Sequence, residues 1–224
     1  MQDSTISSAD IKQLLYYMNR VKSFEKTFVM QKDSMSRLIW GLLLIGAGIL
    51  DGVFSSLQFF GILSITPWIL AIVSGLIIQG FSDRHLINIY SRKTREKKGL
   101  DSDTLFLMGC FILMGVAVGF FNFAELYFLI FPTIALISGF AALVEDRKYY
   151  SKNEEILQKT AYFVTPIVSF SVAIIMLVGN IINSEFFILG GLIFGITFGT
   201  SFCFVAFWNR RQVDSYIEKI DIPE

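Results

Sequence analysis

Three carboxylates stand out in this chain because each lies inside an apolar run or in a short link between two runs. Asp51 lies within the first run, and Glu125 and Glu185 lie in later links. If the apolar runs pair around a pseudo-threefold axis, these acids converge on a mouth that attracts cations. Asn122 and Asn180 occupy corresponding ends of two other runs, so we include them as candidate cation or solute contacts.

Asp51 also has a simpler interpretation. It lies six residues from the expected end of its run, at a depth of about 9 Å for a helical rise of 1.5 Å per residue. An aspartate costs about 2.5–3.5 kcal/mol at the centre of a span and less toward the ends. On this interpretation Asp51 caps a helix at a wet interface and binds nothing. The sequence leaves both interpretations open.

Other kinds of site chemistry find little support in the residue types. His85 is the only histidine, so one chain cannot build a bis-histidine haem or a multi-histidine zinc site. Cys110 and Cys203 lie inside separate apolar runs without a nearby partner. The chain has no P-loop, nucleophile elbow or HExxH motif. We therefore expect a protein that is not an enzyme, with no catalytic residue, no metal site and no cofactor.

Six apolar runs dominate the chain, which is 54% hydrophobic. A helix needs about 20 apolar residues to cross roughly 30 Å of hydrocarbon, and each run is of that length. Asp51 is the only charged residue within them. The sequence therefore predicts an all-α polytopic membrane protein with six transmembrane helices. The expected spans are 38–57, 61–81, 104–122, 126–144, 161–180 and 186–208.

The positive charges indicate the orientation of these spans. All nineteen lysines and arginines fall in segments 1–37, 82–103, 145–160 and 209–224, which alternate with the paired runs. Basic segments stay on the cytoplasmic side. We expect both termini to be cytoplasmic, with 1–37 and 209–224 flanking a membrane domain at 38–208, in the plasma membrane if the cell is prokaryotic. No signal peptide is visible, so we expect the first span to remain as an anchor.

One inner segment, 82–103, carries a dense basic cluster. Cations this close to a span bind anionic lipid headgroups, at about 1 kcal/mol each. The topology signal alone also explains the cluster. Nucleic acid is not an expected partner, because the run is short and Asp101 and Asp103 follow it. The six candidate headgroup contacts are Arg84, Arg92, Lys93, Arg95, Lys97 and Lys98.

Short outer links predict that the spans pair as three antiparallel hairpins. Ala71 and Gly75 in the second run match Ala135 and Gly139 in the fourth, and similar charged residues follow both runs. A threefold tandem repeat explains this likeness, and so does convergence among helices built from few residue types.

Glycines spaced four apart are the clearest packing signal. Residues four apart share one helix face, and small ones let two backbones approach closely. We also expect Pro67, Pro132 and Pro166 to kink the second, fourth and fifth runs. The expected packing glycines are Gly48, Gly52, Gly75, Gly115, Gly119, Gly139, Gly191, Gly195 and Gly199.

Residues 8–32 repeat apolar side chains at helical spacing, which predicts an amphipathic helix. Such a helix lies in the lipid headgroup layer or packs against a partner. The leading functional hypothesis is a non-catalytic packing or accessory component of a membrane assembly, in contact with the bilayer and with other membrane subunits or further copies of itself. The alternative is a small-solute or cation transporter or channel with an acidic outer mouth.

Overall fold

The computed structural model describes residues 8–57, 66–78, 80, 102–158 and 163–220. All regular elements in these ranges are helical, so the all-α prediction is confirmed for them. The α-helices are α1 (Ser8–Ser56), a helix at Thr66–Ile78, α3 (Ser102–Phe123), α4 (Ile130–Lys152), α5 (Val164–Ile182) and α6 (Gly190–Ile220). Two 3₁₀ helices, η1 (Tyr127–Leu129) and η3 (Ser184–Leu189), precede α4 and α6.

Four helical stretches are long and apolar enough to cross a membrane, and they correspond to the predicted runs one, four, five and six. The other two runs contain apolar helical stretches at Thr66–Ile78 and, within α3, at Met108–Phe123 in the described residues. The four long stretches are Gln13–Ser56, Tyr127–Ser151, Val164–Ile182 and Phe186–Glu218.

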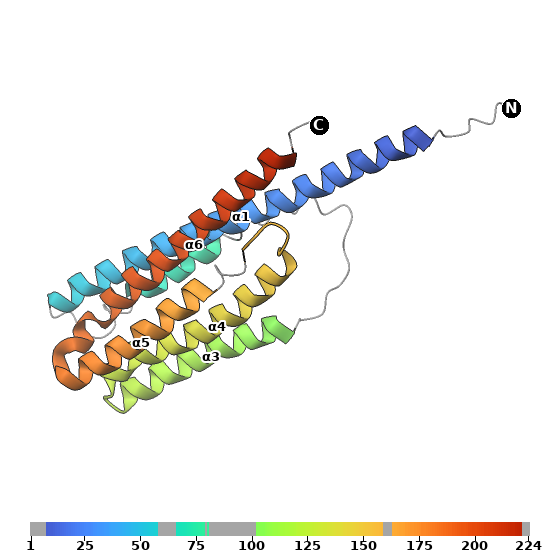
Figure 1. Ribbon diagram of the computed structural model, residues 1–224. Helices are drawn as coiled ribbons and strands as arrows, with labels where there is room; N and C mark the ends of the chain where they lie inside the picture. The colour runs from blue at the N-terminus through green and yellow to red at the C-terminus, as the bar shows by residue number, and fades with distance from the viewer. Residues whose placement is uncertain (1–7, 58–65, 79, 81–101, 159–162, 221–224) are drawn as a thin grey trace.

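The labelled helices lie roughly parallel in one elongated bundle (Figure 1). Contacts run from α1 to α6, from α6 to α5, from α5 to α4 and from α4 to α3, and the contact between α1 and α6 is the most extensive. The N-terminal end of α1 and the C-terminal end of α6 lie at the same end of the bundle. We call this the polar end, and we call the opposite end, which holds η1 and η3, the turn end.

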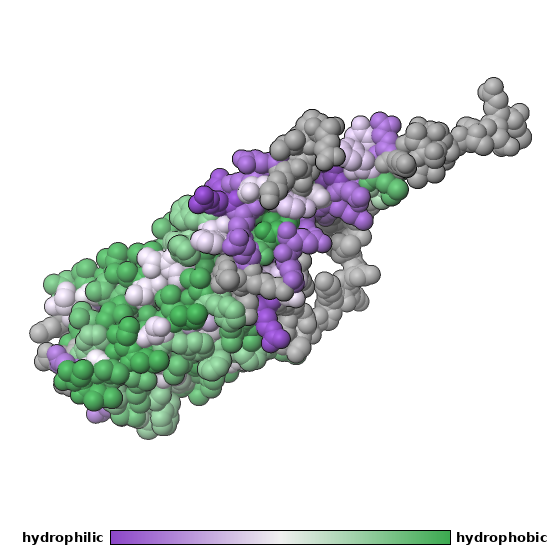
Figure 2. All heavy atoms as spheres, viewed as in Figure 1, coloured by the Kyte–Doolittle hydropathy of each residue, from purple (hydrophilic) through white to green (hydrophobic). Residues whose placement is uncertain are grey.

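Hydropathy divides the molecule along its length. On the face drawn in Figure 2, apolar residues cover the turn end and most of the bundle, while hydrophilic residues gather toward the polar end. Two buried apolar clusters follow the same division. One joins α4, α5 and α6 around Ala135, Ala173 and Phe194. The other joins α1, the segment after α4 and α6 around Met30, Leu157 and Val213.

The contact of α1 with α6 follows from the spacing of small side chains along α1. Ser34, Gly41 and Gly48 are buried at intervals of seven residues. Thr27 and Met30, one heptad earlier, are buried at an interval of three. A repeat of 3.5 residues keeps one stripe of a helix facing its partner over many turns. This stripe is what α1 presents to the antiparallel α6.

Glycines on both helices bring the two backbones into direct contact. A methyl group at Gly48 would lie 2.8 Å from the Cα of Gly195, and one at Gly195 would lie 2.6 Å from the Cα of Gly48. One turn further, a methyl group at Gly199 would lie 2.6 Å from the carbonyl oxygen of Gly41. Backbone atoms cannot move aside as a flexible side chain does, so these sites admit only hydrogen on Cα.

Two of the expected proline kinks are wrong. Pro132 and Pro166 lie in the first turns of α4 and α5, which begin at Ile130 and Val164. An N–H in the first turn has no partner inside the helix, so proline fits there without bending the chain. Both apolar runs therefore begin before their α-helices, and hydropathy alone does not show where α4 and α5 start.

The N-terminal helix is also different from the expected one. Residues 8–32 do not form a separate helix, because α1 continues without a break from Ser8 to Ser56. No glycine or proline interrupts residues 8–40, so nothing in this part of the chain bends the helix. A helix that continues straight into a span cannot lie flat in the headgroup layer of the same membrane.

The glycine contact predicts the effect of one methyl group. We expect Gly195→Ala to lower the free energy of unfolding by about 1–3 kcal/mol, because the added methyl group forces α1 away from α6. Unfolding in mixed micelles with increasing denaturing detergent measures this change. Gly115→Ala is the matched control, since nothing lies within 4 Å of the corresponding methyl position. Equal stabilities of the two variants would contradict the packing argument.

Candidate functional site

Asp51 lies near the end of α1 and is almost fully buried, with 3% of its surface exposed. Its carboxylate rests on the first turn of α6, where a methyl group at Gly191 would overlap the Oδ2 atom. The adjacent Gly52 faces Leu192 of α6, at 3.1 Å from the position of a methyl group. The carboxylate therefore occupies the space that a side chain at position 191 would fill.

Aromatic rings form the rest of the surroundings of Asp51. The indole N–H of Trp68, on the helix Thr66–Ile78, lies near the carboxylate but has no hydrogen-bond partner in the described residues. The Trp68 ring lies 6.0 Å from the Phe131 ring and 5.8 Å from the Phe194 ring, measured between centroids. Asp51 is thus an acid at the meeting point of three helices. Among the described residues, no lysine or arginine forms an ion pair with it.

The other predicted cation contacts have separate surroundings. Glu125 is exposed in the turn between α3 and η1, with a left-handed backbone φ of 58°. The Asn122 side chain donates a hydrogen bond to Val118 O of its own helix. Glu185 belongs to η3, and its side chain lies outside the described part of the structure. No contact in the described residues brings Asp51, Asn122 and Glu125 together.

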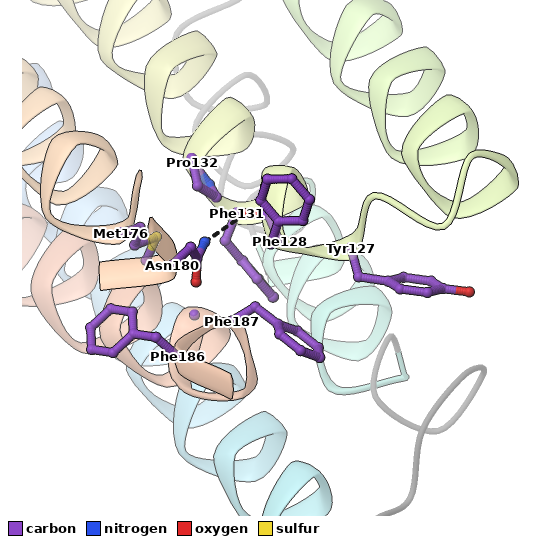
Figure 3. A pocket seen from close by; sticks show the side chains of 9 residues that line it. Tyr127, Phe128, Phe131, Pro132, Met176, Asn180, Phe186 and Phe187 are labelled. Carbon is purple, nitrogen blue, oxygen red and sulfur yellow. Dashed lines mark hydrogen bonds between the residues drawn. The ribbon is translucent and has the colours of Figure 1, made fainter. Parts of the chain in front are cut away.

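Asn180 lines a narrow aromatic crevice at the turn end (Figure 3). Its side-chain nitrogen donates a 2.7 Å hydrogen bond to Phe128 O, and its buried side-chain oxygen has no partner within the described part of the chain. The crevice has no room for a water molecule, so it offers no solute path in this conformation. The residues around it are Tyr127, Phe128, Phe131, Pro132, Met176, Asn180, Phe186, Phe187 and Gly190.

The remaining predicted glycines fall into two groups. A methyl group at Gly75 would lie 2.5 Å from the Trp40 ring of α1, and one at Gly139 would lie 2.7 Å from the Phe170 ring of α5. Gly115 and Gly119 of α3 face open space. The spacing of four is the same in both groups, so spacing alone does not distinguish them.

The predicted headgroup cluster lies outside the described residues. These six positions are Arg84, Arg92, Lys93, Arg95, Lys97 and Lys98.

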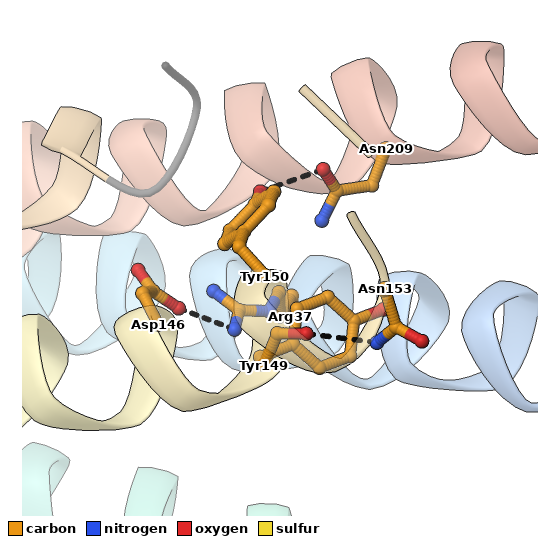
Figure 4. A network of polar contacts seen from close by, with 6 residues as sticks. All are labelled: Arg37, Asp146, Tyr149, Tyr150, Asn153 and Asn209. Atoms are coloured by element: carbon orange, nitrogen blue, oxygen red, sulfur yellow. Dashed lines mark hydrogen bonds and ion pairs between the residues drawn. The ribbon is translucent and has the colours of Figure 1, made fainter. Parts of the chain in front are cut away.

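A buried ion pair joins α1 to α4 toward the polar end (Figure 4). The Arg37 Nη2 atom donates to the Asp146 Oδ1 atom at 2.5 Å, and the two side chains are 12% and 2% exposed. The Tyr149 ring lies beside the guanidinium, with its centroid 5.2 Å from Cζ. Both residues border the predicted spans, so the ion pair lies where the apolar part of the bundle gives way to its polar end.

Tyr150 extends this polar cluster to α6. Its hydroxyl group donates a 2.7 Å hydrogen bond to the Asn209 side-chain oxygen, and both residues are buried. The Asn209 side-chain nitrogen and the Asp146 Oδ2 atom have no partner in the described residues. Buried polar atoms are normally hydrogen-bonded, so these two atoms are exceptions within the cluster.

Burial and charge shape the titration of the cluster. Burial alone would lower the pKa of the Arg37 guanidinium, but the charge of Asp146 and their hydrogen bond outweigh it and raise this pKa. Burial raises the pKa of Asp146, against the opposing effects of Arg37. Burial also raises the pKa of Tyr149, and it raises that of Tyr150 to about 12. At neutral pH both tyrosines therefore keep their hydroxyl protons, which lets Tyr150 donate to Asn209.

Sequence reasoning missed this cluster. Arg37 directly precedes the first run and Asp146 follows the fourth, so both were assigned to solvated inner segments. The one indication in the sequence is a charged pair that recurs after the second and fourth runs, as Asp83-Arg84 and Asp146-Arg147. A tandem repeat already explains this recurrence, so it does not point to a buried ion pair.

The Arg37–Asp146 and Tyr150–Asn209 contacts can hold the helices together. The described residues contain no group of three or more His, Cys, Asp or Glu side chains that could hold a metal ion.

No known protein family, curated protein or solved structure matches this chain.

The buried ion pair predicts a strong coupling between two substitutions. We expect Arg37→Met and Asp146→Asn each to lower the free energy of unfolding by about 3–5 kcal/mol, because each leaves a buried charge alone. The double variant should lose much less than the sum, since neither charge remains. Detergent unfolding of all four proteins measures the coupling free energy.

A matched pair provides the control for this cycle. Lys26 of α1 and Glu155, in the segment after α4, also form an ion pair, at 2.8 Å, but their side chains are 32% and 78% exposed. We expect Lys26→Met and Glu155→Gln to show little coupling, because water screens an exposed pair. Similar coupling in both cycles would mean that burial does not strengthen the Arg37–Asp146 pair.

Proposed function

We propose that this protein is a six-span membrane protein with both termini in the cytoplasm. Four helices of spanning length and two further apolar helices in the remaining runs support this topology. The ends of α1 and α6 at one end of the bundle also agree with an even number of spans. The confinement of all nineteen cations to four alternating segments supports the cytoplasmic side for the polar end.

We further propose that the protein is a non-catalytic accessory component of a membrane assembly, and that it binds a partner protein through the first part of α1. One observation carries this proposal. Residues 13–19 are exposed on all sides of α1, which extends beyond the C-terminal end of α6. A soluble helix surface rarely exposes so many large apolar side chains unless another protein covers them. They are Leu14, Leu15, Tyr16, Tyr17, Met18, Val21 and Phe24.

The position of this surface favours a protein partner over lipid. The stretch is continuous with a span and lies beyond the buried contacts of Thr27 and Met30, so it points away from the bilayer that the same helix crosses. The closely packed contact between α1 and α6 also favours a structural role, because it leaves no path between these two helices.

Photo-crosslinking in the native membrane tests the proposal. A photoreactive amino acid at Val21 should form a covalent adduct with another polypeptide, whereas one at Ile174, exposed on α5, should react with lipid. An adduct of twice the chain mass would identify a second copy as the partner. Lipid adducts alone at Val21 would contradict the proposal.

Substitutions in the same stretch provide a second test. For this test the photoreactive amino acid replaces Tyr17. We expect Leu14→Ser together with Val21→Ser to remove the adduct formed there without lowering the stability of the bundle, because both side chains are exposed. Asn19→Ser, which changes an exposed polar residue between them, is the matched control and should leave the adduct unchanged.

A second candidate function, transport of a small solute or cation, is favoured by the buried carboxylate of Asp51 within a span. If Asp51 and Glu125 line a cation path, Asp51→Asn and Glu125→Gln should each reduce cation flux into reconstituted vesicles, because each removes a negative charge. Glu155→Gln, at the polar end, should leave flux unchanged. Equal flux in all proteins would count against this second candidate.

A further inference from the structure

The turn end contains a titratable group that neither the assembly role nor the buried ion pair uses. Asp51 is 3% exposed, and its neighbours come from three other elements. They are Gly191 on α6, Trp68 on the helix Thr66–Ile78 and Phe131 on α4, whose ring also lies against Gly191. None of these three residues carries a charge or titrates.

Counter-charges are also missing from the nearby chain. The segment 58–65, which follows α1, contains no charged residue in the sequence. The other acidic residues in the elements at this end of the bundle are Glu125, which is exposed, and Glu185 in η3. Both would repel a second negative charge if they were close to Asp51.

An acid in these surroundings must either be neutral or admit water. A carboxylate without a partner is far more costly in an apolar medium than the neutral acid, and such a group takes up a proton instead. The closed packing around Asp51 therefore fits the protonated form. The neutral acid has one O–H that donates and one carbonyl oxygen that accepts, and the buried Trp68 indole N–H near it has no hydrogen-bond partner in the described residues.

We propose that Asp51 is a proton-binding site, and that its proton holds the ends of α1, α6 and the helix Thr66–Ile78 together. Loss of the proton leaves a negative charge on the Asp51 carboxylate, which rests against Gly191. That charge is tolerated only if the three helix ends separate and water enters. Proton binding and closure of the turn end are therefore linked. This inference requires neither transport nor a partner protein.

A hydrophobic carbodiimide tests the protonation of Asp51 directly. The acid adds across one C=N bond of dicyclohexylcarbodiimide: its proton goes to nitrogen and its oxygen to carbon. The acyl group then migrates from oxygen to nitrogen, and nothing leaves. The product is a stable N-acylurea, whose mass exceeds that of the protein by one reagent molecule.

We expect the full-length protein in lipid vesicles to gain one such adduct at Asp51, in a yield that falls as the pH rises. Asp51→Asn should abolish the adduct, whereas Glu125→Gln and Glu185→Gln should leave it unchanged. An unlabelled Asp51 in the folded protein, or labelling that does not depend on pH, would overturn the proposal. Protection by sodium ions at constant pH would also overturn it, since the site would then bind a metal cation.

Fluorescence of Trp68 tests the link between the proton and closure. In a variant with Trp40→Phe and Trp208→Phe, Trp68 is the only tryptophan. We expect its emission to shift to longer wavelength with rising pH as water reaches the ring, and Asp51→Asn to remove this shift. An unchanged emission while carbodiimide labelling varies with pH would refute the link.

Substitution of Gly191, against which the carboxylate rests, provides an independent measurement. Gly191→Ala should displace the carboxylate, so that Trp68 emits at longer wavelength at every pH and the carbodiimide yield falls. Gly115→Ala, which meets nothing within 4 Å, should behave as the unsubstituted protein does. If Gly191→Ala fails to fold, the comparison of Asp51→Asn with Glu185→Gln still tests the proposal.

Discussion

The close approach of α1 and α6 is the constraint on which the other contacts depend. Gly48 and Gly195 touch through their Cα atoms, so these helices lie as near to each other as two backbones can. This contact sets the antiparallel register of the pair. In that register, the Asp51 carboxylate meets Gly191 of α6, which has no side chain to exclude it.

The same contact explains why the two buried polar sites lie at opposite ends. Between them α1 presents mainly small or apolar residues to its neighbours, and buried hydroxyl groups such as those of Ser169 and Ser201 donate to backbone carbonyls. Arg37 meets a partner of opposite sign, and Asp51 meets aromatic rings and glycine. The first site is stabilised by pairing and the second by neutrality, which are the two ways in which a protein buries an ionisable group.

The sequence alone predicts the helical class and four of the long apolar helices, because hydrocarbon demands long runs without charge. It does not predict which helices pack most closely. The glycines of α3 have the same spacing as those of α6, yet Gly115 faces open space and Gly195 touches α1. Gly41, seven residues before Gly48, carried the better signal, since it extends one stripe over several turns. The Arg37–Asp146 pair could not be predicted, because it joins residues more than a hundred positions apart that both look solvated in a linear sequence.

The continuity of α1 has a mechanical consequence. Its 49 residues form a rod about 74 Å long, of which roughly 30 Å is enough to cross hydrocarbon. The remaining length, more than half of the rod, would project beyond any membrane that the apolar part of α1 crosses. The first part of α1 would therefore act as a rigid spacer between that membrane and whatever binds its tip.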